Sequence, residues 1–169
     1  MAIIYSFSPI GEGYGIADSI VASNDGALLT LTFNASSSYP DAVITSVSFD
    51  GIDVEPIIVG VSPGFGDVNF VSSTNYNLPG GNTVDFDADF SFTASPPPTQ
   101  SGLNDGESMT FQFDTYSLEM VVGVHVQSIG EQSASYVSNI LPEPSGVLML
   151  GLACLMALWA RQRVSRGMV

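Results

Sequence analysis

Short runs that alternate apolar and polar residues fill most of the chain. Clear examples are residues 27–33, 43–49, 83–93 and 108–114, and a valine-rich run covers residues 119–127. In a strand, successive side chains point to opposite faces, so this alternation predicts strands with one buried face. Turn residues such as Asp-Gly separate the runs. About eight or nine such strands with short connections predict an antiparallel β-sandwich or jelly roll.

The C-terminal end has a different pattern. Residues 146–160 form an uncharged apolar run, and the three basic residues of the chain follow it: Arg161, Arg163 and Arg166. As a helix this run would be about 22 Å long, against about 30 Å for a hydrocarbon core. Arginine side chains reach the membrane surface and the bilayer thins locally, so we expect a membrane anchor with its arginines in the cytoplasm. A buried C-terminal helix of a soluble domain is the alternative.

The chain therefore divides into a β domain, residues 1–138, and a tail, residues 139–169, that ends in the basic segment 161–169. The tail opens with Pro142-Glu143-Pro144-Ser145, directly before the apolar run. This order of polar motif, apolar run and arginines resembles the PEP-CTERM sorting signal of Gram-negative bacteria. The resemblance implies that an exosortase, a membrane transpeptidase-like enzyme, recognises the tail and removes it near the Pro-Glu-Pro motif. It also implies a bacterium that makes exopolysaccharide.

Two segments of the β domain resemble the same family. Residues 102–111 resemble the G-L-x-x-G-E-S-x-x-F strand motif of exosortase substrates, and residues 123–130 resemble the strand that closes such domains. Both imply the β architecture without an activity. Residues 1–9 depart from the family, because they lack the basic residue and the apolar length of a secretory leader. We therefore expect that an upstream segment is missing from this sequence, or that the gene is degenerate and its product is not exported.

Charge narrows the function further. Sixteen of the 17 acidic residues precede Glu143, whereas no lysine or arginine does, and the whole chain has a formal net charge of −14. A domain without cations cannot neutralise phosphates, which excludes nucleic-acid binding. Such a field attracts divalent cations or a basic partner, and it also keeps a protein soluble outside the cell. The single cysteine, Cys154, lies in the apolar run, so no intrachain disulfide can form.

Asp85, Asp87 and Asp89 are the clearest candidates for metal ligands. On a strand over residues 83–93 they would share one face, with carboxylates about 7 Å apart. A Ca²⁺ ion would relieve their repulsion, although a solvated strand face explains the same spacing. An EF-hand is excluded, because Phe90 stands where that loop needs glycine and no glutamate occupies its last position. The acidic turn at residues 50–55 offers further oxygen ligands or is an ordinary hairpin turn.

Nothing in the sequence points to catalysis. His125 is the only histidine and could pair with a serine, but the chain has no Gly-x-Ser-x-Gly motif. We expect a non-enzymatic exported protein of the envelope or extracellular matrix, anchored in the inner membrane until an exosortase processes it, with exopolysaccharide as a partner. The alternative is a calcium-assisted carbohydrate-binding module of the same fold, in which tyrosines such as Tyr14, Tyr39 and Tyr76 stack on sugars.

Overall fold

Antiparallel strands dominate the computed structural model, which describes residues 3–62, 68–74, 77–114 and 120–140. Within these residues the strands are β1 (Ile3–Ile10), β2 (Ile20–Asp25), β3 (Leu28–Phe33), β4 (Val43–Asp50), β5 (Ile57–Ser62), β6 (Phe70–Ser73), β7 (Phe90–Ala94), β8 (Ser108–Gln112), β9 (Val121–Ile129) and β10 (Gln132–Ile140). The short helices are η1 (Ala17–Ser19), η2 (Gly81–Thr83) and α1 (Pro98–Ser101). The expected all-β, antiparallel class is confirmed.

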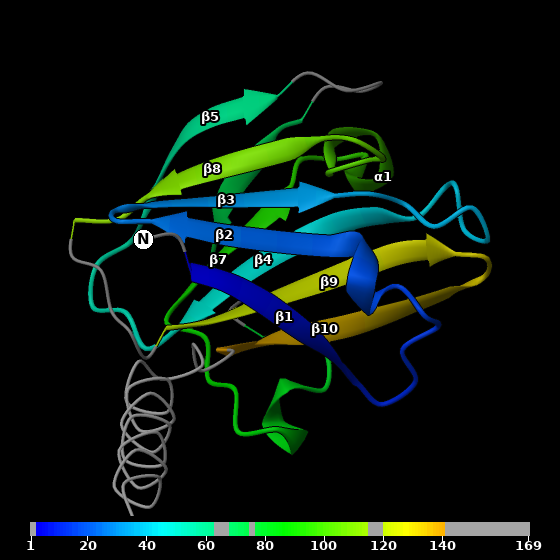
Figure 1. Ribbon diagram of the computed structural model, residues 1–169, viewed down its shortest axis with the longest axis horizontal. Helices are drawn as coiled ribbons and strands as arrows, with labels where there is room; N and C mark the ends of the chain where they lie inside the picture. Colours follow the sequence, from blue (N-terminus) through cyan, green and yellow to red (C-terminus); the bar gives the residue numbers. More distant parts are fainter. Residues whose placement is uncertain (1–2, 63–67, 75–76, 115–119, 141–169) are drawn as a thin grey trace, which may run out of the picture.

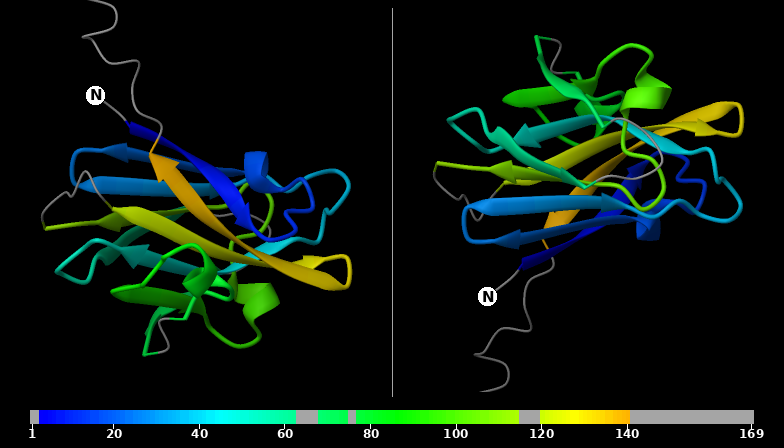
Figure 2. Two further views of the ribbon diagram at one scale, coloured as in Figure 1. Left: turned by 90° about the horizontal axis from the view of Figure 1, so that it is seen from below. Right: turned by 90° about the horizontal axis from the view of Figure 1, so that it is seen from above.

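The strands form one sheet in the order β5-β8-β3-β2-β1-β10-β9-β4-β7-β6. Phe49 of β4 nevertheless packs edge-on against Phe111 of β8, with ring centroids 4.9 Å apart, and against Phe113, at 5.4 Å. Five strands separate β8 from β4 in the sheet. The rings can meet only because the sheet curls until its two halves face each other, as the views in Figure 1 and Figure 2 show.

The alternation seen in the sequence builds the core inside this curl. In β3, Leu29, Leu31 and Phe33 are fully buried, whereas Thr30 and Thr32 between them are partly exposed on the outer face. Each buried side chain of this size contributes about 1.5–3 kcal/mol of hydrophobic stabilisation. The core therefore explains why the strands keep their register, because a slip by one residue would expose the whole apolar set.

The segment that leads into β8 ties the two halves together. Leu103 exchanges two backbone hydrogen bonds with Ile44 of β4, at 2.9 and 3.0 Å, while the Phe33 N–H of β3 donates to the Glu107 carbonyl at 3.0 Å. The buried Glu107 carboxylate accepts hydrogen bonds from the backbone and side-chain nitrogens of Asn104, at 2.7 and 3.1 Å. The first part of the G-L-x-x-G-E-S-x-x-F motif, residues 102–107, is thus a turn that joins β3 and β4 and leads into β8.

Candidate ligand-binding pocket

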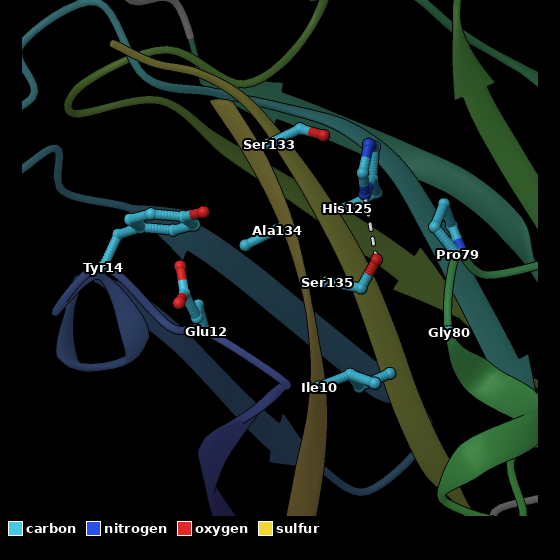
Figure 3. A pocket seen from close by; sticks show the side chains of 9 residues that line it. All are labelled: Ile10, Glu12, Tyr14, Pro79, Gly80, His125, Ser133, Ala134 and Ser135. Atoms are coloured by element: carbon cyan, nitrogen blue, oxygen red, sulfur yellow. Dashed lines mark hydrogen bonds between the residues drawn. The ribbon is translucent and has the colours of Figure 1, made fainter. Parts of the chain in front are cut away.

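A shallow pocket of about 350 Å³ lies over the β9–β10 hairpin, close to its turn (Figure 3). Its floor comes from the two strands: His125, Ser133, Ala134 and Ser135. Two loops form its walls, with Glu12 and Tyr14 on one side and Pro79 and Gly80 on the other. Ile10, at the end of β1, completes the lining. Segments far apart in the sequence therefore build one site.

The floor is polar and uncharged. His125 and Ser135 stand directly opposite each other in the β9–β10 register, and Nδ1 of the imidazole lies 2.9 Å from Oγ of the serine. Partial burial lowers the pKa of His125 below its usual 6.5, so the imidazole is neutral at pH 7. With Nδ1 occupied by Ser135, the other ring nitrogen is the one that remains to bind a ligand.

The first wall is the loop that carries Glu12 and Tyr14, and a residue of the main core holds it in place. Tyr136 of β10 is fully buried, and its hydroxyl donates a 2.6 Å hydrogen bond to the carbonyl of Gly13. A Cβ atom on Gly13 would lie 2.6 Å from Cγ of Pro9, so only glycine lets the loop fold back on β1 here. This anchor sets the positions of Glu12 and Tyr14, the residues on either side of Gly13, at the pocket.

Tyr14 itself adopts an unusual backbone conformation. Its φ is +47°, a left-handed value that costs a non-glycine residue of this kind about 1–3 kcal/mol. Partial burial and, to a lesser extent, the nearby Glu12 carboxylate raise the pKa of Tyr14. The phenol therefore keeps its proton across the physiological pH range. A strained residue held by its surroundings at a concave site is a signal of function.

The second wall rests on a small apolar cluster outside the curl. Leu78, Phe86 and Ala88 are buried against the outer face of the sheet rather than in the main core. Gly123 of β9 provides the space, since a Cβ atom there would lie 2.7 Å from both Leu78 Cδ2 and Phe86 Cζ. This contact positions the loop that carries Pro79 and Gly80 beside the hairpin.

The pocket combines ring surfaces with polar groups that can bind a small molecule. Ser135 is only 3% exposed, and its hydroxyl hydrogen-bonds the His125 ring. The pocket offers one tyrosine ring, one proline ring, one carboxylate and several neutral hydrogen-bonding groups. Such a mixture of flat apolar surfaces with a few polar groups is typical of small-molecule sites.

The strand predicted over residues 83–93 is wrong in its first half. η2 ends at Thr83, Asp85 has a left-handed φ of +57°, and β7 begins only at Phe90. The apolar residues of this stretch pack on the outer face of the sheet, so the chain loops over β9 instead of pairing with a neighbour. Asp85, Asp87 and Asp89 therefore do not share a strand face.

Asp89 and Asp50 have structural partners between this loop and the turn after β4. The Asp89 carboxylate accepts hydrogen bonds from the backbone N–H groups of Gly51 and Ile52, at 2.8 and 2.9 Å. The Asp50 carboxylate likewise accepts a hydrogen bond from the Asp87 N–H, at 3.2 Å. Across the described parts of the chain, no three His, Cys, Asp or Glu side chains come together in a way that could hold a metal ion.

The predicted sorting tail lies outside the described residues. This applies to the motif Pro142, Glu143, Pro144 and Ser145, to the apolar run 146–160, and to Arg161, Arg163 and Arg166. Tyr76, one of the tyrosines expected to stack on sugars, also lies outside them. Among the residues that are described, no helix has the length and apolar character needed to cross a membrane.

No protein-family model matches the chain, and no curated protein or solved structure matches it either. The pocket must therefore be judged by its own chemistry. Sequence reasoning singled out Tyr14 and His125 separately but did not bring them together, and it missed Glu12. The run Gly-Glu-Gly-Tyr-Gly at residues 11–15 was the available signal, because three glycines in five residues indicate a backbone folded into an unusual shape.

Proposed function

We propose that this chain is a non-enzymatic exported protein, sorted by an exosortase to the cell envelope or the extracellular polysaccharide matrix. The single observation that carries the proposal is the three-part tail: Pro142-Glu143-Pro144-Ser145, the apolar run 146–160 and the closing arginines. The apolar run holds the protein in the inner membrane until the enzyme cuts near the Pro-Glu-Pro motif. The β domain then acts outside the cytoplasm.

Two properties of the β domain support this destination. Its fold supports the expected sandwich or jelly roll, because the curled sheet brings two halves face to face over one core, and such modules are common outside the cell. The domain also lacks lysine and arginine throughout, so trypsin-like proteases find no cleavage site before residue 161.

Intact-mass spectrometry on protein from the native culture tests the proposal. We expect a species in the envelope or medium that ends near residues 142–145. Replacing Glu143 with glutamine should leave the tail in place if the motif is the recognition element, whereas Glu131→Gln, an exposed glutamate in the β9–β10 turn, should be processed normally. Exported protein that retains its full tail in a strain with an active exosortase would contradict the proposal.

A second candidate function is a carbohydrate-binding module of the same fold. The observation in its favour is the pocket, in which the strained Tyr14 faces polar groups of the hairpin. The calcium-assisted form of this function gains no support from Asp85, Asp87 and Asp89, since they do not lie on a strand. Calorimetry with glycans, in the presence of Ca²⁺ and of a chelator, separates the two forms and removes both if no heat of binding is seen.

A further inference from the structure

We propose that the pocket between Tyr14 and Pro79 binds one uncharged hexopyranose unit of a polysaccharide. This inference rests on the carbohydrate-binding function, the second of the two proposed above. It adds the site, the residues that recognise the sugar and the charge class of the ligand. Three independent features of the pocket lead to it: its shape, its hydrogen-bonding groups and its charge.

Shape comes first. The two walls present the ring of Tyr14 and the ring of Pro79 on opposite sides of the floor (Figure 3). The volume of about 350 Å³ is at the lower end of the range for small-molecule sites, about 300–1,000 Å³. A pyranose ring has a flat C–H face that packs on an aromatic ring, and its size suits a site of this kind.

The loop that carries Tyr14 is prepared for this contact. The Tyr136 hydroxyl holds the Gly13 carbonyl in place by a hydrogen bond. The next residue, Tyr14, has a left-handed φ, which sets the backbone conformation of the loop at the edge of the pocket. Tyr14 is also partly packed against the main core, so its ring has little freedom to lose on binding. A preorganised aromatic platform lowers the entropic cost of capturing a small ligand.

The hydrogen-bonding groups match a polyhydroxylated ligand. The Glu12 carboxylate accepts hydrogen bonds, the Ser133 hydroxyl both donates and accepts, and the neutral imidazole of His125 provides its second ring nitrogen. Sugar hydroxyls also donate and accept, so they can satisfy all three groups. An apolar ligand would leave these groups without partners, at a cost in free energy for each.

Charge selects among sugars. Residues 1–160 contain no lysine or arginine, and the one histidine is neutral at pH 7, so the pocket has no cation to pair with a uronate or a sulfate. Among the described residues that line the pocket, Glu12 alone carries a formal charge, within a strongly acidic domain. Anionic polysaccharides are repelled by this field, which leaves uncharged hexoses as the ligand class.

The test uses the full chain in a detergent without a sugar headgroup. Saturation-transfer NMR and calorimetry measure binding of dextran and galactan fragments as uncharged probes, of polygalacturonate as the anionic probe and of chitosan oligomers as the cationic probe. We expect binding of an uncharged probe, with an affinity that changes little between low and high salt because no ion pair forms.

Two variants locate the site. Tyr14→Asn removes the ring but keeps a residue that tolerates left-handed φ, and Ser133→Phe fills the pocket from an exposed floor position. Each should weaken binding of the uncharged probe by about tenfold or more. Glu55→Gln, a charge change at an exposed position that does not line the pocket, should leave the affinity unchanged.

Each contrary outcome identifies what has failed. Uncharged glycan binding that survives both Tyr14→Asn and Ser133→Phe would overturn the site but leave the carbohydrate-binding function standing. Binding of only the anionic or only the cationic probe would overturn the ligand class. Binding of no glycan would remove the inference and the carbohydrate-binding function together, while the sorting proposal would still be decided by the mass of the exported protein.

Discussion

The two faces of the β9–β10 hairpin begin from the same alternating pattern and end in different environments. On the inner face, Val122, Val124 and Tyr136 are fully buried in the main core. On the outer face, Gly123 and His125 support a small apolar cluster and the pocket. The inner face therefore belongs to the main core, whereas the outer face carries the pocket and holds the loop around η2. Substitutions on the two faces should therefore differ in how much stability they cost and in how much of the structure they disturb.

The largest effect is expected in the inner core. Phe49 is fully buried and packs edge-on against three other rings. Phe49→Ala removes these contacts and leaves a cavity, so the free energy of unfolding should fall by about 3–5 kcal/mol. Urea denaturation followed by circular dichroism measures the change. Val71→Ala, at a side chain that is 49% exposed, should stay within about 0.5 kcal/mol of the wild type; equal losses in both variants would contradict this view of the core.

Gly123→Ala probes the outer face. The new Cβ atom would press on Leu78 and Phe86, so we expect a loss of about 1–3 kcal/mol and displacement of the loop around η2, with the sheet intact. Gly60→Ala is the matched control, because its Cβ atom would meet Thr110 at an ordinary 3.8 Å. Hydrogen exchange should rise in residues 77–89 of the Gly123 variant alone. Faster exchange throughout the core strands would show that the outer cluster is part of the main folding unit.

Tyr136 connects the two faces, because its ring lies in the core and its hydroxyl holds the loop of the first pocket wall. Tyr136→Phe keeps the packing but leaves the Gly13 carbonyl without this donor, so stability should fall by about 1 kcal/mol. Burial, with smaller effects of Tyr14 and Tyr39, raises the pKa of Tyr136 to about 12.

The raised pKa of Tyr136 adds a pH test. A phenol that ionises near pH 10 when unfolded stabilises the fold fully below that pH, and this contribution is lost as the pH rises towards 12. The alkaline loss of stability between pH 10 and 12 should therefore be smaller in Tyr136→Phe than in the wild type. Thermal melts across this range measure it, and identical curves for the two proteins would rule out the anchoring role of this hydroxyl.

The sequence predicted the core better than the site. The alternation in residues 27–33 and 43–49 depends only on local spacing, and both runs are strands with buried apolar faces. The run at 83–93 has the same spacing, but Phe86 and Ala88 bury themselves on the outer face of the sheet, against a glycine about 35 residues later. Periodicity cannot distinguish these two forms of burial, because both need the same apolar residues.

The pocket depends on contacts that no local pattern contains. The Tyr136 hydroxyl meets Gly13 across 123 positions of the chain, and the left-handed φ of Tyr14 follows from that anchor and from the flanking glycines. β1 and β2 were not recognised as strands either, although β1 pairs with β10 and β2 lies between β1 and β3. The sequence therefore predicted the type of fold and pointed to some residues of the pocket. It did not predict that these residues lie side by side.

The smallest expected effect concerns His125, and it tests the outer face without changing its shape. Burial lowers the pKa of this imidazole, so the fold favours the neutral form. Its contribution to stability is present above pH 6.5 and is lost as the pH falls through the folded-state pKa, because the unfolded chain takes up the proton first. The urea midpoint should therefore drop between pH 7.5 and 5, and less so in His125→Gln. Since the chain has one histidine, NMR titration of its ring reports this group alone. An equal drop of the urea midpoint in both proteins would assign the pH dependence to the carboxylates. The fold would then not favour the neutral imidazole, and the argument for an uncharged ligand would lose one of its supports.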